Sequence, residues 1–243
     1  MVIHCSTLSN DVLPCMIQSP AYCRPAAFDL FARQLSHLED TTGLFRAAFA
    51  ISLHERPEAQ LSEAETIVEN LIDTVRKRVQ SVSQQALLAH LHDVLFDVFG
   101  LRGNQESYYD PANSYLGDVL QTRMGIPISL VLVYKRIAEP LGLTVHGVNT
   151  PGHFLAEVEL TGPAGVKSMY VDPFFEGMVL DRHDMARRVV ETTGKQLEPG
   201  TDVLARATPR IWLGRMLNNL QASFAAAGNE RNVCAMEELR GLL

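Results

Sequence analysis

The stretch from Arg123 to Phe175 constrains the fold most, because it joins one apolar helical pattern to two strand patterns. Pro127 suits the first position of a helix, where its missing N–H would have no partner in any case. Gly142 is typical of the position just past a helix end. The residues between them are strongly apolar, so we expect a buried helix from Pro127 to about Leu141.

Two strand patterns follow this helix. Residues 153–160 and 167–172 alternate well enough for half-buried strands, and the Gly-Pro-Ala-Gly sequence between them predicts a hairpin loop. His153 opens the first strand and Asp172 closes the second, and these two ends of an antiparallel hairpin lie side by side. We therefore expect the two side chains to meet, with the Pro151-Gly152 turn presenting the imidazole at a cleft.

Five short blocks in the middle of the chain carry a resemblance to a known family. They are Phe99–Asn104, Tyr108–Leu116, Arg123–Leu130, Pro151–Leu155 and Val171–Phe174. In this order they resemble the transglutaminase-like fold, which is related to papain, and more specifically the SirB family, a largely bacterial group linked to the regulation of invasion genes. In enzymes of that superfamily, a Cys at the start of the helix is the nucleophile, a His is its base and an Asp orients the His. The resemblance implies the last two roles for His153 and Asp172.

The position of the nucleophile departs from those enzymes. Gly125 and Gly142 keep the superfamily's spacing, which puts Pro127 where the Cys would stand. None of the four cysteines lies within the five blocks; they are Cys5, Cys15, Cys23 and Cys234. Thiol chemistry needs a thiolate activated by its paired base. The sequence keeps the base and its orienting carboxylate and lacks the thiol.

Three functions remain open at this stage. The missing thiol favours a non-catalytic binding or regulatory module that recognises a peptide or protein through a degenerate cleft. The alternative is a Cys-independent hydrolase or acyl-transfer enzyme in which His153 and Asp172 activate water or Ser129. Ser129 lies in the first turn of the helix, where main-chain amides stabilise an oxyanion, but it is turned about 200° from Pro127 around the helix. In the third, the His–Asp pair is purely structural.

No metal or cofactor is expected. A zinc site could be imagined from His146, His153, Asp172 and His183, but neither an HxH nor an HExxH spacing supports it. The glycines at 100 and 103 are too sparse for a phosphate-binding loop and do not follow a strand.

A polar loop from Arg102 to Asn113 offers further candidates for ligand binding, because loops carry functional residues more often than helices do. Four residues in or near it are candidate ligand contacts: Tyr108, Tyr109, Asn113 and Arg123. A tyrosine joins apolar area to a polar tip and suits the wall of a groove. Two structural alternatives stand beside this: Asn113 or Ser114 caps a short helix, and Arg102 and Arg123 pair with Asp110 or Asp118.

The fold expected from these patterns is α+β, with a helical N-terminal half packed on a transglutaminase-like core that contains a small antiparallel sheet. Four regions are predicted: an irregular arm (1–25), a helical region (26–100), the core (101–195), and a linker with a tetratricopeptide-like helical hairpin (196–243). A single hairpin of this kind cannot form a solenoid, so we expect it to dock on the body. The sequence from Ser62 to Glu65 predicts a capping box at a helix start.

Composition and charge limit the class of partner and the cellular location that we expect. A net charge of −7 and a pI near 5.6 argue against a general nucleic-acid binder. The apolar stretches fall short of the ~18 residues a membrane helix needs, and the first residues lack the pattern of a secretory signal. Four cysteines without zinc-type spacing fit a reduced compartment. We therefore expect a cytoplasmic protein with a protein or peptide partner; the sequence leaves the oligomeric state open.

Overall fold

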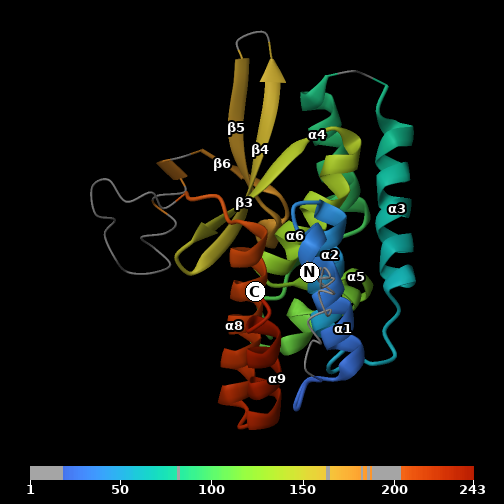
Figure 1. Cartoon of the computed structure of the whole chain (residues 1–243). Coiled ribbons are helices and arrows are strands. Elements are labelled where there is room, and N and C mark those ends of the chain that lie inside the picture. The colour runs from blue at the N-terminus through green and yellow to red at the C-terminus, as the bar shows by residue number, and fades with distance from the viewer. Residues whose placement is uncertain (1–18, 81–82, 163–164, 182, 185–186, 188–203) are drawn as a thin grey trace, which may run out of the picture.

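The chain is an α+β protein, as the sequence predicted (Figure 1). The computed structural model describes residues 19–80, 83–162, 165–181, 183–184, 187 and 204–243. Most of the expected N-terminal arm lies outside the described residues. So does the greater part of the expected linker before the C-terminal helices.

Four helices form the N-terminal half. They are α1 (Pro25–Gln34), α2 (Thr41–Ser52), α3 (Leu61–Arg78) and α4 (Gln84–His92), the last continued by a π-helical turn (Asp93–Val98). Phe31, Phe45 and Phe49 are fully buried between them. The predicted capping box is wrong, because α3 begins at Leu61 and its first amides receive no side-chain cap. Ser62 lies inside the first turn, and its carbonyl accepts from Thr66 Oγ1 at 2.7 Å.

Helix α6 (Pro127–Ala138) lies at the centre of the molecule. Every residue of α6 except Lys135 is buried, which is typical of a helix surrounded by protein. A 3-10 turn, Glu139–Leu141, extends it, and Gly142 ends it with φ at +97°, a conformation that glycine adopts without steric cost. The helix therefore has the bounds expected from its Pro and Gly.

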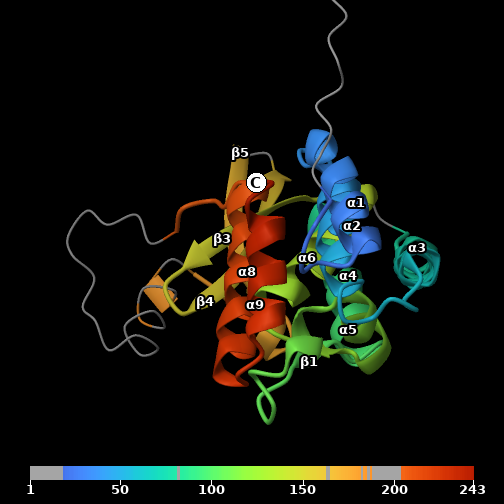
Figure 2. The same ribbon diagram turned by 60° about the horizontal axis from the view of Figure 1, so that its bottom comes forward.

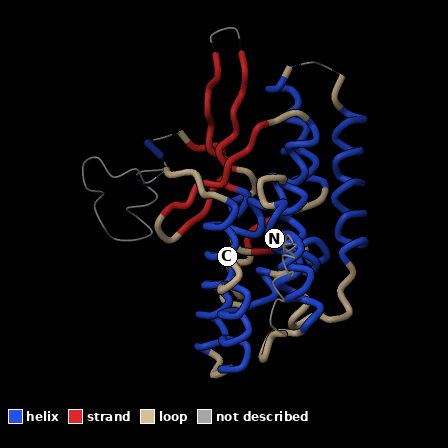
Figure 3. The backbone as a smooth tube through the Cα atoms, viewed as in Figure 1, coloured by secondary structure: helices blue, strands red, loops and turns tan. Residues whose placement is uncertain are grey.

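A four-stranded antiparallel sheet lies beside α6, in the order β3-β4-β5-β6 (Figure 3). Its strands are β3 (Thr144–Thr150), β4 (His153–Gly162), β5 (Gly165–Asp172) and β6 (Met178–Leu180). Strand β3 was not predicted. Gly147, at the middle of β3, interrupts the strand pattern in the sequence. The close packing of Trp212 requires a glycine there, because an added Cβ would lie 2.3 Å from the Trp212 ring.

Short elements connect α4 to α6. Strands β1 (Arg102–Gly103) and β2 (Met124–Gly125) pair in parallel, and a 3-10 helix (Pro111–Ser114) precedes α5 (Leu116–Thr122). This segment holds the loop with the adjacent tyrosines beside the start of α6.

The C-terminal helices α8 (Pro209–Ala226) and α9 (Glu230–Arg240) form an antiparallel pair that docks on the body. Figure 2 shows α8 between the strands and the helical half. Trp212 Nε1 donates to the carbonyl of Ile128 at 3.2 Å, which joins α8 to the first turn of α6. On α9, Asn232 Oδ1 lies 3.0 Å from the buried His54 Nε2. The docking expected for this pair is thus made by both helices.

Candidate functional site

His153 and Asp172 meet, as the hairpin pattern predicted. His153 Nε2 lies 2.8 Å from Asp172 Oδ2. The His153 side chain is 12% exposed, and the Asp172 side chain is fully buried. His153 opens β4 directly after the turn formed by Pro151 and Gly152, where Gly152 has φ of +73°, which favours glycine. The pair therefore lies at the end of the sheet where two strands and a tight turn converge.

The chain that follows Asp172 folds back on both its carboxylate and its main-chain carbonyl. Oδ1 accepts from the amide of Phe174 at 3.1 Å, and the Asp172 carbonyl accepts from Gly177 at 2.9 Å. A hydrogen bond thus joins His153 Nε2 to Asp172 Oδ2, and the other ring nitrogen, Nδ1, makes no hydrogen bond with the described part of the chain.

Four aromatic rings form a continuous group with His153, which we call the aromatic cluster: Tyr108, Tyr109, Phe174 and Phe175. Tyr108 makes edge contacts with Tyr109 at 5.3 Å and with Phe174 at 5.8 Å between centroids. Phe174 and Phe175 lie 6.1 and 6.2 Å from the imidazole. A Cβ on Gly103 would come within 2.4 Å of the Phe174 ring, so the missing side chain at that position makes room for the cluster.

The outer members of this region are unusually exposed for large apolar side chains. Tyr109 is 81% exposed, Phe175 37%, and Met178, which pairs with Asp172 across β5 and β6, 45%. Beside them lies a pocket of about 100 Å³, whose walls include Tyr108 and Tyr109 from the loop and residues of α8. Grouped apolar exposure of this kind marks surfaces that bind other molecules.

Asn113 supports the tyrosine loop rather than capping a helix. Its Nδ2 donates to the carbonyls of Ser107 at 2.7 Å and Tyr108 at 3.2 Å, and its Oδ1 accepts from Asn104 at 2.9 Å. The predicted capping by Asn113 or Ser114 is therefore wrong. Asp110 caps the 3-10 helix instead, since its Oδ1 accepts from the amide of Ala112 at 2.9 Å. Helix α5 begins without a side-chain cap.

The Arg123 guanidinium lies over the ring of Phe99, 5.5 Å from its centroid, and is not ion-paired with Asp110 or Asp118 in the described structure. Asp118 instead pairs with Arg56 at 3.1 Å. Arg123 itself has φ of +63°, where α5 ends and β2 begins. The expected pairing of Arg123 is thus replaced by a cation–π contact at a sharp change of chain direction.

Ser129 is completely buried in the first turn of α6. Its Oγ lies 2.6 Å from the carbonyl of Asn113 and 2.9 Å from the carbonyl of Ile126. The hydroxyl therefore fastens the tyrosine loop to α6. Pro127, also buried, occupies the first position of the same helix.

The two described cysteines lie away from the start of α6. Cys23 is buried just before α1, and Cys234 is in α9. Burial, with the charge of Glu238 nearby, raises the pKa of the Cys23 thiol to about 12, which keeps it protonated at neutral pH. Neither thiol has the features of an activated nucleophile.

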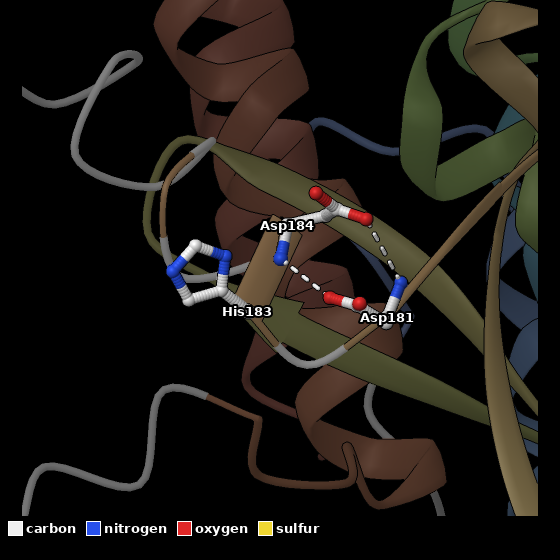
Figure 4. Close-up of side chains that lie close together, drawn as sticks. All are labelled: Asp181, His183 and Asp184. Atoms are coloured by element: carbon white, nitrogen blue, oxygen red, sulfur yellow. Dashed lines mark hydrogen bonds between the residues drawn. The ribbon is translucent and has the colours of Figure 1, made fainter.

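The histidines imagined around zinc have different acidic neighbours. His146 Nε2 lies 3.3 Å from Glu159 Oε1, on the sheet. His183 groups with Asp181 and Asp184, whose ligand atoms lie within 4.8 Å of one another (Figure 4). Asp181 Oδ1 accepts from the amide of Asp184 at 2.8 Å, a contact typical of a helix start. This exposed group is explained by local capping.

Residues 62–218 match the family model of the transglutaminase-like superfamily, and the chain belongs to that superfamily. Among curated proteins it is similar to a UPF0162 protein of Xylella fastidiosa, with 32% identity over 191 residues that cover 77% of this chain and 66% of that protein. The UPF0162 protein of Vibrio cholerae is 27% identical over 64% of this chain and 56% of its own length. The chain thus matches about two thirds or less of the length of these relatives.

The similarity extends beyond bacteria over a shorter stretch. F-box only protein 21 of Mus musculus is 42% identical over 72 residues, which cover 30% of this chain and 12% of that protein. No solved structure matches the chain. In the described part of the chain, no helix combines the length and apolar character needed to cross a membrane.

Sequence reasoning identified the His–Asp pair and the two tyrosines but missed three further residues of this region. Phe174 and Phe175 were not among the predicted site residues, although an aromatic pair two residues after the aspartate was a visible signal. Arg215, on α8, lies far along the chain, and only the docking of α8 brings it to the turn before His153.

Proposed function

We propose that this protein is a non-catalytic transglutaminase-like protein that binds a polypeptide segment in the cleft around His153 and the aromatic cluster. We further propose that Pro127 occupies the position of the nucleophilic cysteine in related enzymes. The observation that carries the proposal is the combination of an intact His153–Asp172 pair with a buried proline at the start of α6. A base without a nucleophile cannot form the acyl-enzyme of thiol catalysis.

The two exposed rings of the aromatic cluster support a role in binding. Aromatic side chains with one free face are the usual anchors of peptide and protein recognition, because they bury much apolar area at little cost in conformational entropy. Tyr109 is 81% exposed, and Phe175, whose ring lies beside the imidazole of His153, is 37% exposed. The resemblance to the SirB family favours a regulatory setting for this binding.

Turnover assays test the proposal against its alternative, a Cys-independent hydrolase or acyl-transfer enzyme. The wild type, His153→Ala and Ser129→Ala would be incubated with small ester, amide and glutamine-donor substrates. We expect no turnover above background in any of them, because Ser129 Oγ is buried and held by main-chain carbonyls. Melting curves would verify that each variant is folded.

A variant with both Cys5 and Cys15 replaced by Ala completes this test, since these residues lie outside the described part of the chain. Turnover that disappears in folded His153→Ala would overturn the proposal and make the protein an enzyme. Loss of that turnover in the double Cys variant, or in Ser129→Ala, would then identify the nucleophile.

A further inference from the structure

Arg215 is a half-buried cation without a carboxylate partner in the described structure. Two cations of α6 with little exposure are both paired: Arg136 with Glu69 at 2.8 Å, and Lys135 with Glu139. Burying a charge is costly unless a counter-charge or several hydrogen bonds compensate it. Arg215 therefore differs from these two cations of the described structure.

Arg215 is also rigidly placed at the candidate site. One guanidinium nitrogen, Nη1, donates to the Thr150 carbonyl at 2.9 Å and to Asn149 Oδ1, in the residues that lead into the turn before His153. Its guanidinium lies over the Phe154 ring at 5.6 Å from the centroid. Only neutral acceptors are thus bound to it, and burial lowers its pKa. No opposite charge offsets the energetic cost of burying the Arg215 guanidinium.

Two neighbours connect Arg215 to the aromatic cluster and to an unused polar group. Tyr108 is close enough to interact with it electrostatically. Thr150 is fully buried, and its Oγ1 has no hydrogen-bond partner among the described residues. An unpaired cation and an unpaired hydroxyl therefore occur together, next to the turn that carries His153.

The face of α8 that carries Arg215 continues into the pocket. Asn219 and Ser223 follow at intervals of four residues, which places them on the same face of the helix, and both line the pocket opposite Tyr108. Asp110 lines the pocket as well, but its Oδ1 caps the 3-10 helix by accepting from Ala112. Arg215 thus lies on the same face of α8 as two residues of the pocket, one turn before the first of them.

We propose that Arg215 recognises a side-chain carboxylate, that of an Asp or Glu, in the polypeptide bound at this cleft. This inference rests on the proposed binding function and specifies its ligand. A side chain fits better than a chain terminus, because Arg215 is half-buried and a side chain reaches further inward from a bound main chain than a terminal carboxylate does. Arginine pairs with carboxylates through a planar fork of donors, and a partly desolvated site strengthens this pairing.

The test begins with selection of random peptides on the immobilised full-length chain. We expect enrichment of Asp or Glu at one position beside an apolar residue. The best peptide and its Glu→Gln or Asp→Asn analogue would then be titrated against the wild type, Arg215→Gln and Arg215→Lys. Arg231→Gln, which removes an exposed cation from α9, is the matched control.

On the wild type and on Arg231→Gln, neutralising the acid should weaken binding about 10- to 100-fold, the range for a hydrogen bond between charged groups. On Arg215→Gln the two peptides should bind alike, and Arg215→Lys should keep part of the preference. Melting curves would show that the variants are folded.

The possible failures are distinguishable. If the wild type enriches no peptide, the proposed binding function is wrong and this inference falls with it. If peptides are enriched without an acidic preference, or the preference survives in Arg215→Gln, only the role of Arg215 is overturned. If peptides bind only with a free C-terminus and lose affinity when it is amidated, the assignment to a side-chain carboxylate is overturned.

Discussion

Asp172 is the residue on which the geometry of the site depends most. Its buried carboxylate joins the His153 imidazole, at one oxygen, to the amide of Phe174, at the other. One side chain thus orients the histidine and also places the first ring of the aromatic cluster. Its removal leaves polar groups without partners in the interior, and this is more costly than losing one exposed contact.

We expect Asp172→Ala to lower the free energy of unfolding by about 2–3 kcal/mol, because a buried carboxylate and two hydrogen bonds disappear. For a chain of this size, that corresponds to a fall in melting temperature of very roughly 4–12 °C. Urea unfolding of Asp172→Ala, His153→Ala and the double variant gives the coupling energy, which should be about 1–3 kcal/mol. A coupling near zero would show that the two side chains do not interact in solution.

At the scale of single elements, the sequence predicted those parts whose patterns are local. Pro127 and Gly142 set the bounds of α6, and the alternating pattern of β4 brought His153 to the end of the sheet. The caps were not predictable, because Ser62 and Asn113 have capping chemistry in the sequence but other tertiary contacts decide what they bond to. Strand β3 was not predicted, because a glycine at position 147 disfavours a strand in the sequence. The reason for this glycine is its contact with α8, which is far away along the chain.

The π-helical turn after α4 is held against α6 by a half-buried histidine at the end of α4. His92 Nε2 lies 3.0 Å from the hydroxyl of Tyr134, and the ring of Phe96 packs against both side chains. Burial lowers the pKa of His92 to about 4 from its ordinary value of 6.5. The folded protein therefore holds this ring neutral.

This makes stability dependent on pH in a defined window. As the pH falls below 6.5, the unfolded chain takes up a proton at His92 before the folded chain does, so stability is complete above 6.5 and is lost progressively down to about 4. The loss is at most about 3 kcal/mol, with a slope of up to ~1.4 kcal/mol per pH unit. Urea midpoints measured from pH 7 to pH 4 should fall less steeply in His92→Gln than in the wild type. Equal slopes would contradict a neutral, half-buried His92 in the folded protein.

At the scale of the whole molecule, the two ends of the described chain are joined. Glu238 on α9 accepts from the amides of Ala21 and Cys23, both at 2.7 Å, just before α1 begins. Together with the contact between His54 and Asn232, this attaches the C-terminal pair to the helical half. The composition of these segments gave no sign of the connection, because the partners are more than 170 residues apart.

We expect Glu238→Ala to lower the free energy of unfolding by about 1 kcal/mol, a modest value because Glu238 is only half-buried and water competes for the amides. Glu237→Ala is the matched control. Glu237 is exposed and bonds to Arg240 and Gln221 within the C-terminal pair, so its removal should leave the attachment to α1 intact. The comparison is made by chemical unfolding, and equal effects of the two variants would argue against the role of Glu238.

The chain contains one tryptophan, Trp212, and its indole lies where three parts of the molecule meet. The ring packs 4.7 Å from that of Phe154 on β4, its N–H binds the first turn of α6, and Arg215 follows one turn later on α8. Intrinsic fluorescence therefore reports from a single known position. A shift of emission to longer wavelength would signal separation of α8 from the sheet, and quenching without a shift would signal an event near the turn before His153 while the interface stays closed.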